Sequence, residues 1–87
     1  MTVTRADFLR LLPAAVGGVA FVEERDAFLH SEPRRAWRIA FEPLPELRIG
    51  LIRLERHRVG FAFEGYREAE IEAFMARFEL HFRKGGG

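Results

Sequence analysis

The stretch RIGLIRLERHRVGFAFE, residues 48–64, decides the fold of this chain. Apolar residues alternate with charged or small ones on both sides of the charged segment ERHR at 55–58. A period of two is typical of half-buried β-strands. The stretch therefore predicts a central β-hairpin, with strands at 47–54 and 59–64 and the turn at 55–58. The apolar phase shifts beside Gly50, which predicts a β-bulge near that residue.

Three further strands are predicted before this hairpin. Residues 19–22 and 27–30 are mostly apolar and flank the polar segment EERD, so they predict a second, shorter hairpin. Residues 35–42 alternate cleanly and predict a half-buried strand. Proline has no N–H to donate to a sheet ladder. We therefore expect the segment PLPE at 43–46 to form a connection outside the sheet.

The start of the chain predicts a helix. Thr4 can accept hydrogen bonds from the first amides of the helix, and Asp7 complements the helix dipole. Apolar residues at helical spacing then continue to Leu12. Pro13 disfavours helical geometry at the preceding residue, so the helix is expected to end near Leu12, with one loose turn to Ala15.

A second helix is predicted from Tyr66 or Arg67 to Phe82. Its apolar residues recur at i, i+3, i+4, i+7 and i+11, which is the strongest periodic signal in the chain. Glutamates near its start and basic residues near its end suit the helix dipole. The apolar stripe consists of Ile71, Phe74, Met75, Phe78 and Phe82.

Both helices have one apolar stripe to bury, and the economical solution places both on one face of one sheet. The sequence thus predicts a single α+β domain over residues 1–87. We expect a two-layer sandwich with a five-stranded antiparallel sheet, in the order α-β-β-β-β-β-α. Residues 84–87 are expected to form a mobile tail after the second helix.

This order of elements is similar to that of frataxin, which is also a small helix–sheet–helix sandwich. The similarity concerns the layout, because TRADFLRLL at 4–12 stands in place of the acid-rich first helix with which that family binds iron. No residue role is transferred. The resemblance implies a frataxin-like accessory protein as one alternative function. A small-molecule-binding or enzymatic role in a pocket between the helices and the sheet is another.

Composition limits the chemistry open to the chain. It has 87 residues, a net charge of +1 and no cysteine, which excludes disulfides, thiolate metal sites and cysteine nucleophiles. Nine phenylalanines in a 48% hydrophobic composition predict a dense core. Asparagine and glutamine are absent, a bias that suits a GC-rich bacterial genome and leaves few groups to orient a polar substrate. We expect a cytoplasmic protein with no membrane contact, because no apolar run approaches the roughly 20 residues of a membrane span.

No group of residues predicts catalysis, a metal or another cofactor. The histidines at 30, 57 and 81 have no metal-ligand spacing. The carboxylates at 23–26 suit a solvated turn, and those at 68–72 suit a helix start. We therefore expect a protein that is not an enzyme and needs no cofactor.

Small residues predict a surface for a partner. The outward positions of the strands at 35–42 and 59–64 include a patch of alanine and glycine, and small residues allow another chain to approach closely. We expect a small accessory module that binds a protein partner, or a second copy as a homodimer, through this open face of the sheet. The predicted patch is Ala40, Gly60 and Ala62, with a charged rim of Arg38, Glu42 and Glu64.

Arginine content gives an alternative prediction of nucleic-acid binding through the sheet. Residues 34–58 hold seven arginines against three glutamates, which makes the middle of the chain basic. The outward positions lack the aromatic residues on which RNA-binding sheets stack bases, and cross-strand Arg–Glu pairs on a solvated face explain the pattern as well. The candidate residues are Arg35, Arg38, Arg48, Arg53, Arg56 and Arg58.

Overall fold

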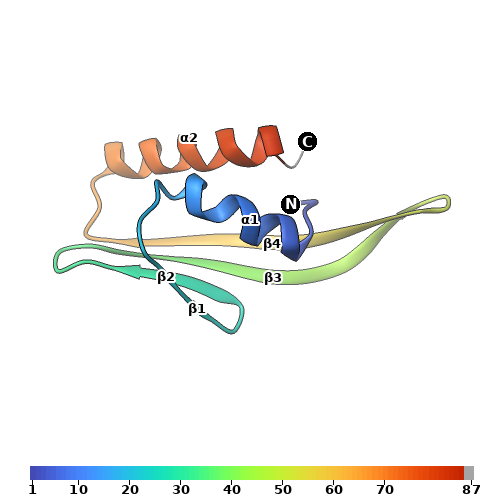
Figure 1. The fold of residues 1–87 in the computed structure, drawn as a ribbon, viewed down its shortest axis with the longest axis horizontal. Helices are drawn as coiled ribbons and strands as arrows, with labels where there is room; N and C mark the ends of the chain where they lie inside the picture. The colour runs from blue at the N-terminus through green and yellow to red at the C-terminus, as the bar shows by residue number, and fades with distance from the viewer. Residues whose placement is uncertain (86–87) are drawn as a thin grey trace.

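The computed structural model describes residues 1–85 and is an α+β fold, as predicted. Two helices lie on one side of an antiparallel sheet, and none of the described elements covers the other side (Figure 1). The sheet has four strands in the order β1-β2-β3-β4, so the prediction of five strands is wrong. The elements are α1 (Arg5–Ala15), β1 (Val22–Glu24), β2 (Ala27–Ser31), β3 (Ala36–Ile49), β4 (Ile52–Glu64) and α2 (Glu68–Gly85).

The central hairpin turns at Gly50 and not at residues 55–58. Gly50 has a φ of 60°, and Ile49 pairs with Ile52 across the two-residue loop. Glycine with positive φ at the first loop position is the pattern of a type II′ turn, whose twist matches that of the strands. The phase shift beside Gly50 therefore marks the turn and not the predicted bulge. The segment at 55–58 continues β4 as a strand.

Pro43 and Pro45 lie inside β3, which joins two segments that we expected to be separate strands. The amide of Phe41 donates to the carbonyl of Asp26 on the β2 side, so by alternation the N-side of Pro43 also points away from β4. β2 ends its pairing at Ala40, and the missing N–H therefore faces an open edge where no ladder bond is lost. The register shifts between residues 44 and 47, so the bulge lies at the second proline.

The helices extend beyond their predicted ends. α1 continues through Pro13 to Ala15, where the carbonyl of Pro13 accepts the amide of Gly18 and closes the helix end. Thr4 is the N-cap, and its hydroxyl accepts the amide of Asp7 at 3.1 Å. α2 includes residues 84 and 85, which the sequence assigns to the tail. The rest of that predicted tail, residues 86–87, lies outside the described part of the chain.

The core lies between the two helices and the sheet and is built mainly of aromatic rings. Phe8 of α1 is fully buried, with its ring centroid 4.0 Å from that of Phe41 in β3 and 5.1 Å from that of Phe82 in α2. Phe78 of α2 meets Phe61 of β4 edge-on at 4.8 Å. Phenylalanines from β2, β3, β4 and both helices thus meet in a single cluster, whereas the three residues of β1 are all exposed.

Candidate functional site

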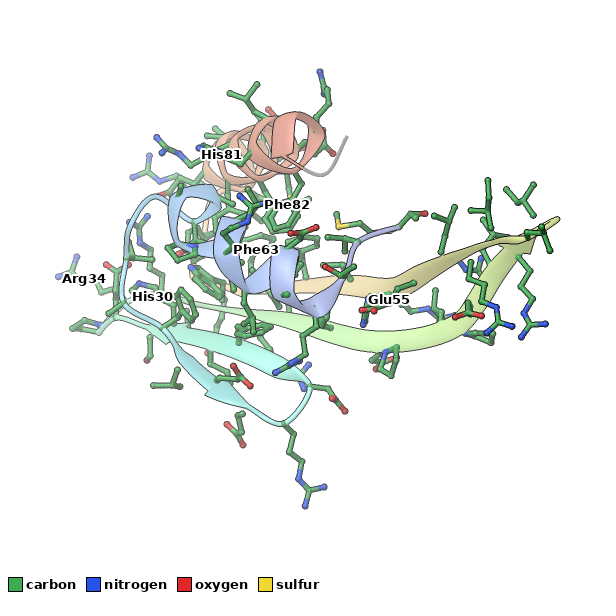
Figure 2. The ribbon with its side chains drawn as sticks, turned by 45° about the vertical axis from the view of Figure 1, so that its right-hand side comes forward. His30, Arg34, Glu55, Phe63, His81 and Phe82 are labelled. Carbon is green, nitrogen blue, oxygen red and sulfur yellow. The ribbon has the colours of Figure 1, made fainter. Side chains whose placement is uncertain are left out.

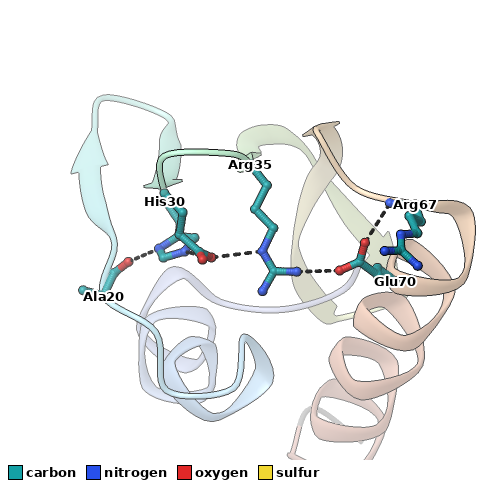
Figure 3. Close-up of polar contacts among 6 residues, drawn as sticks. Ala20, His30, Arg35, Arg67 and Glu70 are labelled. Atoms are coloured by element: carbon teal, nitrogen blue, oxygen red, sulfur yellow. Dashed lines mark hydrogen bonds and ion pairs between the residues drawn. The ribbon is translucent and has the colours of Figure 1, made fainter.

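Four charged side chains form a chain of hydrogen bonds at one end of the sandwich (Figure 3). His30 at the end of β2 donates from Nδ1 to the carbonyl of Ala20 at 2.6 Å and from Nε2 to Glu32 at 2.8 Å. Arg35 donates to Glu32 at 3.2 Å and to Glu70 of α2 at 2.6 Å. We call His30, Glu32, Arg35 and Glu70 the clasp, since they tie the loop before β1, the β2–β3 turn and α2 together.

The clasp changes the protonation of its members. The hydrogen bond to Glu32 raises the pKa of His30 above its usual value, while burial opposes the shift. Both ring nitrogens of His30 face an acceptor, so both hydrogen bonds are made only when the ring is doubly protonated. The same bond lowers the pKa of Glu32, and Glu32 raises the pKa of Arg35. Burial raises the pKa of Tyr66, whose ring lies 4.9 Å below the Arg35 guanidinium.

The clasp lines a hollow of about 300 Å³, but its polar groups are largely hydrogen-bonded to one another and are not free to bind a substrate there. The carboxylate of Glu32 accepts from two donors, and that of Glu70 accepts from Arg35 and from the amide of Arg67. Among the described residues, no buried side-chain nitrogen or oxygen lacks a partner. No group of three or more possible metal ligands gathers within that same part of the chain. The arrangement is suited to holding elements together more than to acid–base catalysis.

His57 is buried in the sheet, although the sequence places it in a turn. Its Nδ1 donates to the carbonyl of Val3 at 2.8 Å, and its ring stacks on Phe41 at 4.0 Å. Its backbone exchanges two hydrogen bonds with Met1, of 2.7 and 2.8 Å. These bonds attach the N-terminal segment to the outer edge of β4, so His57 has a structural role here.

The predicted patch of small residues lies on the uncovered side of the sheet, which we call the back face. Trp37, Ile39 and Phe41 are buried toward the helices, so the alternate positions of β3 point away from them. Ala40 pairs directly with Gly60, and Arg38 pairs with Ala62. A hollow of about 300 Å³ lies on the β2 side of this patch, where Arg38, Ala40 and Glu42 line it. The rim residues Glu42 and Glu64 belong to the same face, opposite Arg58 and Ala36.

The six candidate arginines do not share one surface. Arg38, Arg56 and Arg58 alternate onto the back face, and the guanidinium of Arg56 donates twice to the carbonyl of Pro45. Arg35 belongs to the clasp. Arg48 and Arg53 face each other across the hairpin on its opposite side, and both approach Glu46, at 3.5 and 3.9 Å.

The hairpin formed by residues 44–56 projects beyond both helices, and we call it the arm (Figures 1 and 2). Two cross-strand apolar pairs, Leu47 with Leu54 and Ile49 with Ile52, lie on the side opposite the arginine pair. Ile49 and Ile52 are each 58% exposed, and Leu51 at the tip is fully exposed. Sequence reasoning missed this surface. The signal was present in the five apolar residues at 47–54 that flank Gly50.

Comparisons with known proteins identify no relative: no family model, no curated protein and no solved structure matches the chain. The similarity to frataxin therefore rests on the order of elements alone. Within residues 1–85, no helix has the length and apolar character needed to cross a membrane.

Proposed function

We propose that this chain is a small non-enzymatic interaction module whose arm docks onto a partner protein. The observation that carries the proposal is the apolar side of the arm, which extends past the helix layer. An isolated two-stranded hairpin is marginally stable in water because it cannot cover its own apolar side. A partner surface that covers Ile49, Leu51 and Ile52 would bury these side chains and order the arm.

The back face supports the same proposal as a second contact. Its alanines and Gly60 leave space for a partner's side chains, and Arg38, Glu42 and Glu64 supply a polar rim. An apolar centre with a polar rim is the usual anatomy of protein interfaces. The clasp supports a non-enzymatic role, since its acids and bases satisfy one another.

Site-specific photo-cross-linking tests the arm. A photoreactive residue is placed at Leu51 and, as a matched control, at Leu80, which is also an exposed leucine but lies on α2. We expect the Leu51 position to cross-link one discrete protein in cells. The double variant Ile49→Ser/Ile52→Ser should abolish that product while changing the free energy of unfolding by about 0.5 kcal/mol per site or less, because both side chains are exposed.

Equal products from the Leu51 and Leu80 positions would contradict docking through the arm. So would a product that survives the double variant. Ala62→Arg in the same assay reports on the back face, because a long charged side chain there fills the space beside Gly60. If this variant leaves both the cross-link and the oligomeric state unchanged, the back face takes no part.

Nucleic-acid binding is the second candidate function, favoured by Arg48 and Arg53. Like charges directly opposite each other destabilise a sheet pair, and one carboxylate, that of Glu46, serves both guanidiniums. A phosphate backbone would supply the missing negative charge. Two-stranded ribbons that enter a groove are a known mode of recognition, and the apolar tip at Leu51 resembles a wedge between bases.

Fluorescence anisotropy with mixed-sequence DNA and RNA separates the two candidates. If the arm contacts about 6 phosphates, affinity should fall on the order of 10³-fold between roughly 50 and 200 mM salt. Replacing Arg48 and Arg53 by alanine should then reduce the salt slope by about 2. The absence of binding at low salt would exclude this candidate.

A further inference from the structure

Two of the free edges of the sheet are protected against pairing with another chain. β1 is an edge of three residues, two of which are Glu23 and Glu24. The part of β3 that extends past β2 carries Pro43 and Pro45 and a register shift. Short length, charge, proline and bulges are the devices by which sheets prevent edge-to-edge pairing. Because these two edges carry such devices, an edge of the same sheet that lacks them is a candidate site for strand pairing.

The outer edge of β4 has none of these devices between residues 59 and 63, a part of the chain that the structure describes and that has neither charge nor proline. The hydrogen bonds between His57 and Met1 show that the backbone of His57 points outward, away from β3. By alternation, the N–H and C=O groups of Val59, Phe61 and Phe63 point outward as well. Among the described residues, none of these groups takes part in a strand pair on the outer side, since β4 pairs with β3 alone.

An apolar groove runs along this unprotected edge. It has a volume of about 620 Å³ and lies between β4, α2 and the N-terminal segment. Val59 and Phe61 of β4 are half-buried there, beneath Met75 and Phe78 of α2. The edge therefore offers backbone partners and apolar side chains together, which is the combination that an added strand uses.

We propose that the edge binds the same edge of a second copy, antiparallel, with the two-fold axis at Phe61. In an antiparallel pair with its axis at Phe61, the numbers of two facing residues add up to 122. Phe61 therefore faces Phe61 of the partner subunit, and Val59 faces Phe63 of the partner subunit. All of these residues point their backbone groups outward, so each pair exchanges two hydrogen bonds. The two sheets become one continuous sheet, and the half-buried phenyl rings cover one another.

Charge complementarity favours this register. With residue numbers that sum to 122, Arg58 lies directly opposite Glu64 of the partner subunit, and the symmetry repeats the pair. Opposite charges at facing positions stabilise a sheet pair, whereas like charges destabilise it. The ends also fit, because Met1 already occupies the edge at His57, and the facing residue, Gly65 of the partner subunit, is where β4 has ended. This inference is independent of the arm.

Amide hydrogen exchange measured against protein concentration tests the interface. At about 100 µM, the amides of Val59, Phe61 and Phe63 should be protected, and on dilution toward the monomer they should exchange rapidly. The amides of Gly60 and Ala62 point toward β3 and serve as internal controls that stay slow throughout. Fast exchange of the outward amides at high concentration would overturn the proposal. If sedimentation finds a monomer of about 10.1 kDa at high concentration and the amide exchange rates do not change with concentration, the proposal is overturned as well.

A charge-swap cycle tests the register. Glu64→Arg and Arg58→Glu each place like charges opposite each other at both symmetric positions, so each should weaken the dimer roughly tenfold or more. The double variant restores opposite charges and should bind within about threefold of the unchanged chain. Glu72→Arg on the exposed side of α2 makes the same charge change as a control. Failure of the double variant to recover, or loss of dimer in the control alone, would refute pairing at Phe61.

Discussion

The sharpest stability prediction concerns Gly65, at the end of β4. Gly65 and Gly18 both have a φ of 77°, a conformation that glycine adopts at no steric cost. A Cβ atom added at Gly65 would lie 2.1 Å from the carbonyl oxygen of Arg34, whereas one added at Gly18 would have no atom within 4 Å. Gly65→Ala and Gly18→Ala therefore form a matched pair that differs in the collision and not in the backbone conformation.

The size of the difference follows from how firmly Arg34 is held. Ordinary contact begins at 3.4 Å, so the oxygen would have to retreat by about 1.3 Å, the difference between 3.4 and 2.1 Å. Such a movement disturbs Arg35, whose carbonyl accepts the amide of Glu32 at 2.8 Å and whose side chain belongs to the clasp. The left-handed conformation costs both variants roughly 1 kcal/mol. The collision should add roughly 2–3 kcal/mol for Gly65→Ala.

Urea unfolding measured by Trp37 fluorescence and far-ultraviolet circular dichroism gives both values. We expect Gly18→Ala to lower the free energy of unfolding by about 1 kcal/mol and Gly65→Ala by about 3–4 kcal/mol. The corresponding falls in Tm are about 5 °C and about 15–25 °C. If Gly65→Ala comes within about 0.5 kcal/mol of Gly18→Ala, the close packing of Gly65 against Arg34 is not what stabilises this corner.

Three further predictions concern the clasp, a turn and the core. The pKa of His30 is raised in the folded state, so its stabilising contribution is complete below about pH 6.5 and is lost as the pH rises through the raised value. Unfolding titrations from pH 5 to about 8.5 should therefore show a fall in the free energy of unfolding, which should be smaller in His30→Ala and unchanged in His81→Gln. Arg25→Gly should raise the free energy of unfolding by roughly 0.5–1 kcal/mol, since Arg25 has a φ of 48°, and an unchanged or lower value would contradict strain at this turn. Phe78→Ala should lower it by about 3–5 kcal/mol, and a loss below about 1 kcal/mol in urea titrations would mean that the aromatic cluster repacks freely.

Local pattern identified both helices and much of the sheet. The apolar stripe ending at Phe82 and the alternation of Trp37, Ile39 and Phe41 survive in the structure, because a period of 3.6 or 2 follows directly from backbone geometry. The ends of the helices and strands were harder to predict from the sequence. Pro13 lies inside α1, although its missing N–H costs the helix one hydrogen bond, the one to the carbonyl four residues earlier.

The connectivity of the sheet could not be predicted from local pattern. Pro43 was expected to interrupt the sheet, and it does not, because β3 pairs with β2 only as far as Ala40, opposite the first residue of β2, and the proline therefore lies on an open edge. A glycine beside a phase shift fits a bulge and a turn equally well. The choice for Gly50 depends on which residues pair across it, and those pairs are known from the tertiary structure.

The candidate surfaces also divide into those that local pattern predicts and those that depend on pairing between distant segments. Alternation sufficed to place Ala40 and Gly60 on one side of their strands, and register then set them directly opposite each other. The clasp joins His30 to Glu70, 40 positions apart in the sequence, through two residues of a turn. No spacing rule relates such positions, so this group was not predicted.

The sequence by itself determined which side of each helix and of the strand segments at 37–41 and 59–63 faces the core, because side-chain periodicity is a local property of the backbone. It also determined that cysteine chemistry is absent. Only the tertiary structure decided where strands end, which edges remain open and which charges meet. These depend on pairing between distant segments: β3 extends beyond its pairing with β2 and so accommodates Pro43, and Met1 pairs with β4 at His57. The arm and the unprotected edge beyond His57 are consequences of that pairing; the arm carries the proposed function, and the edge carries the proposed dimer.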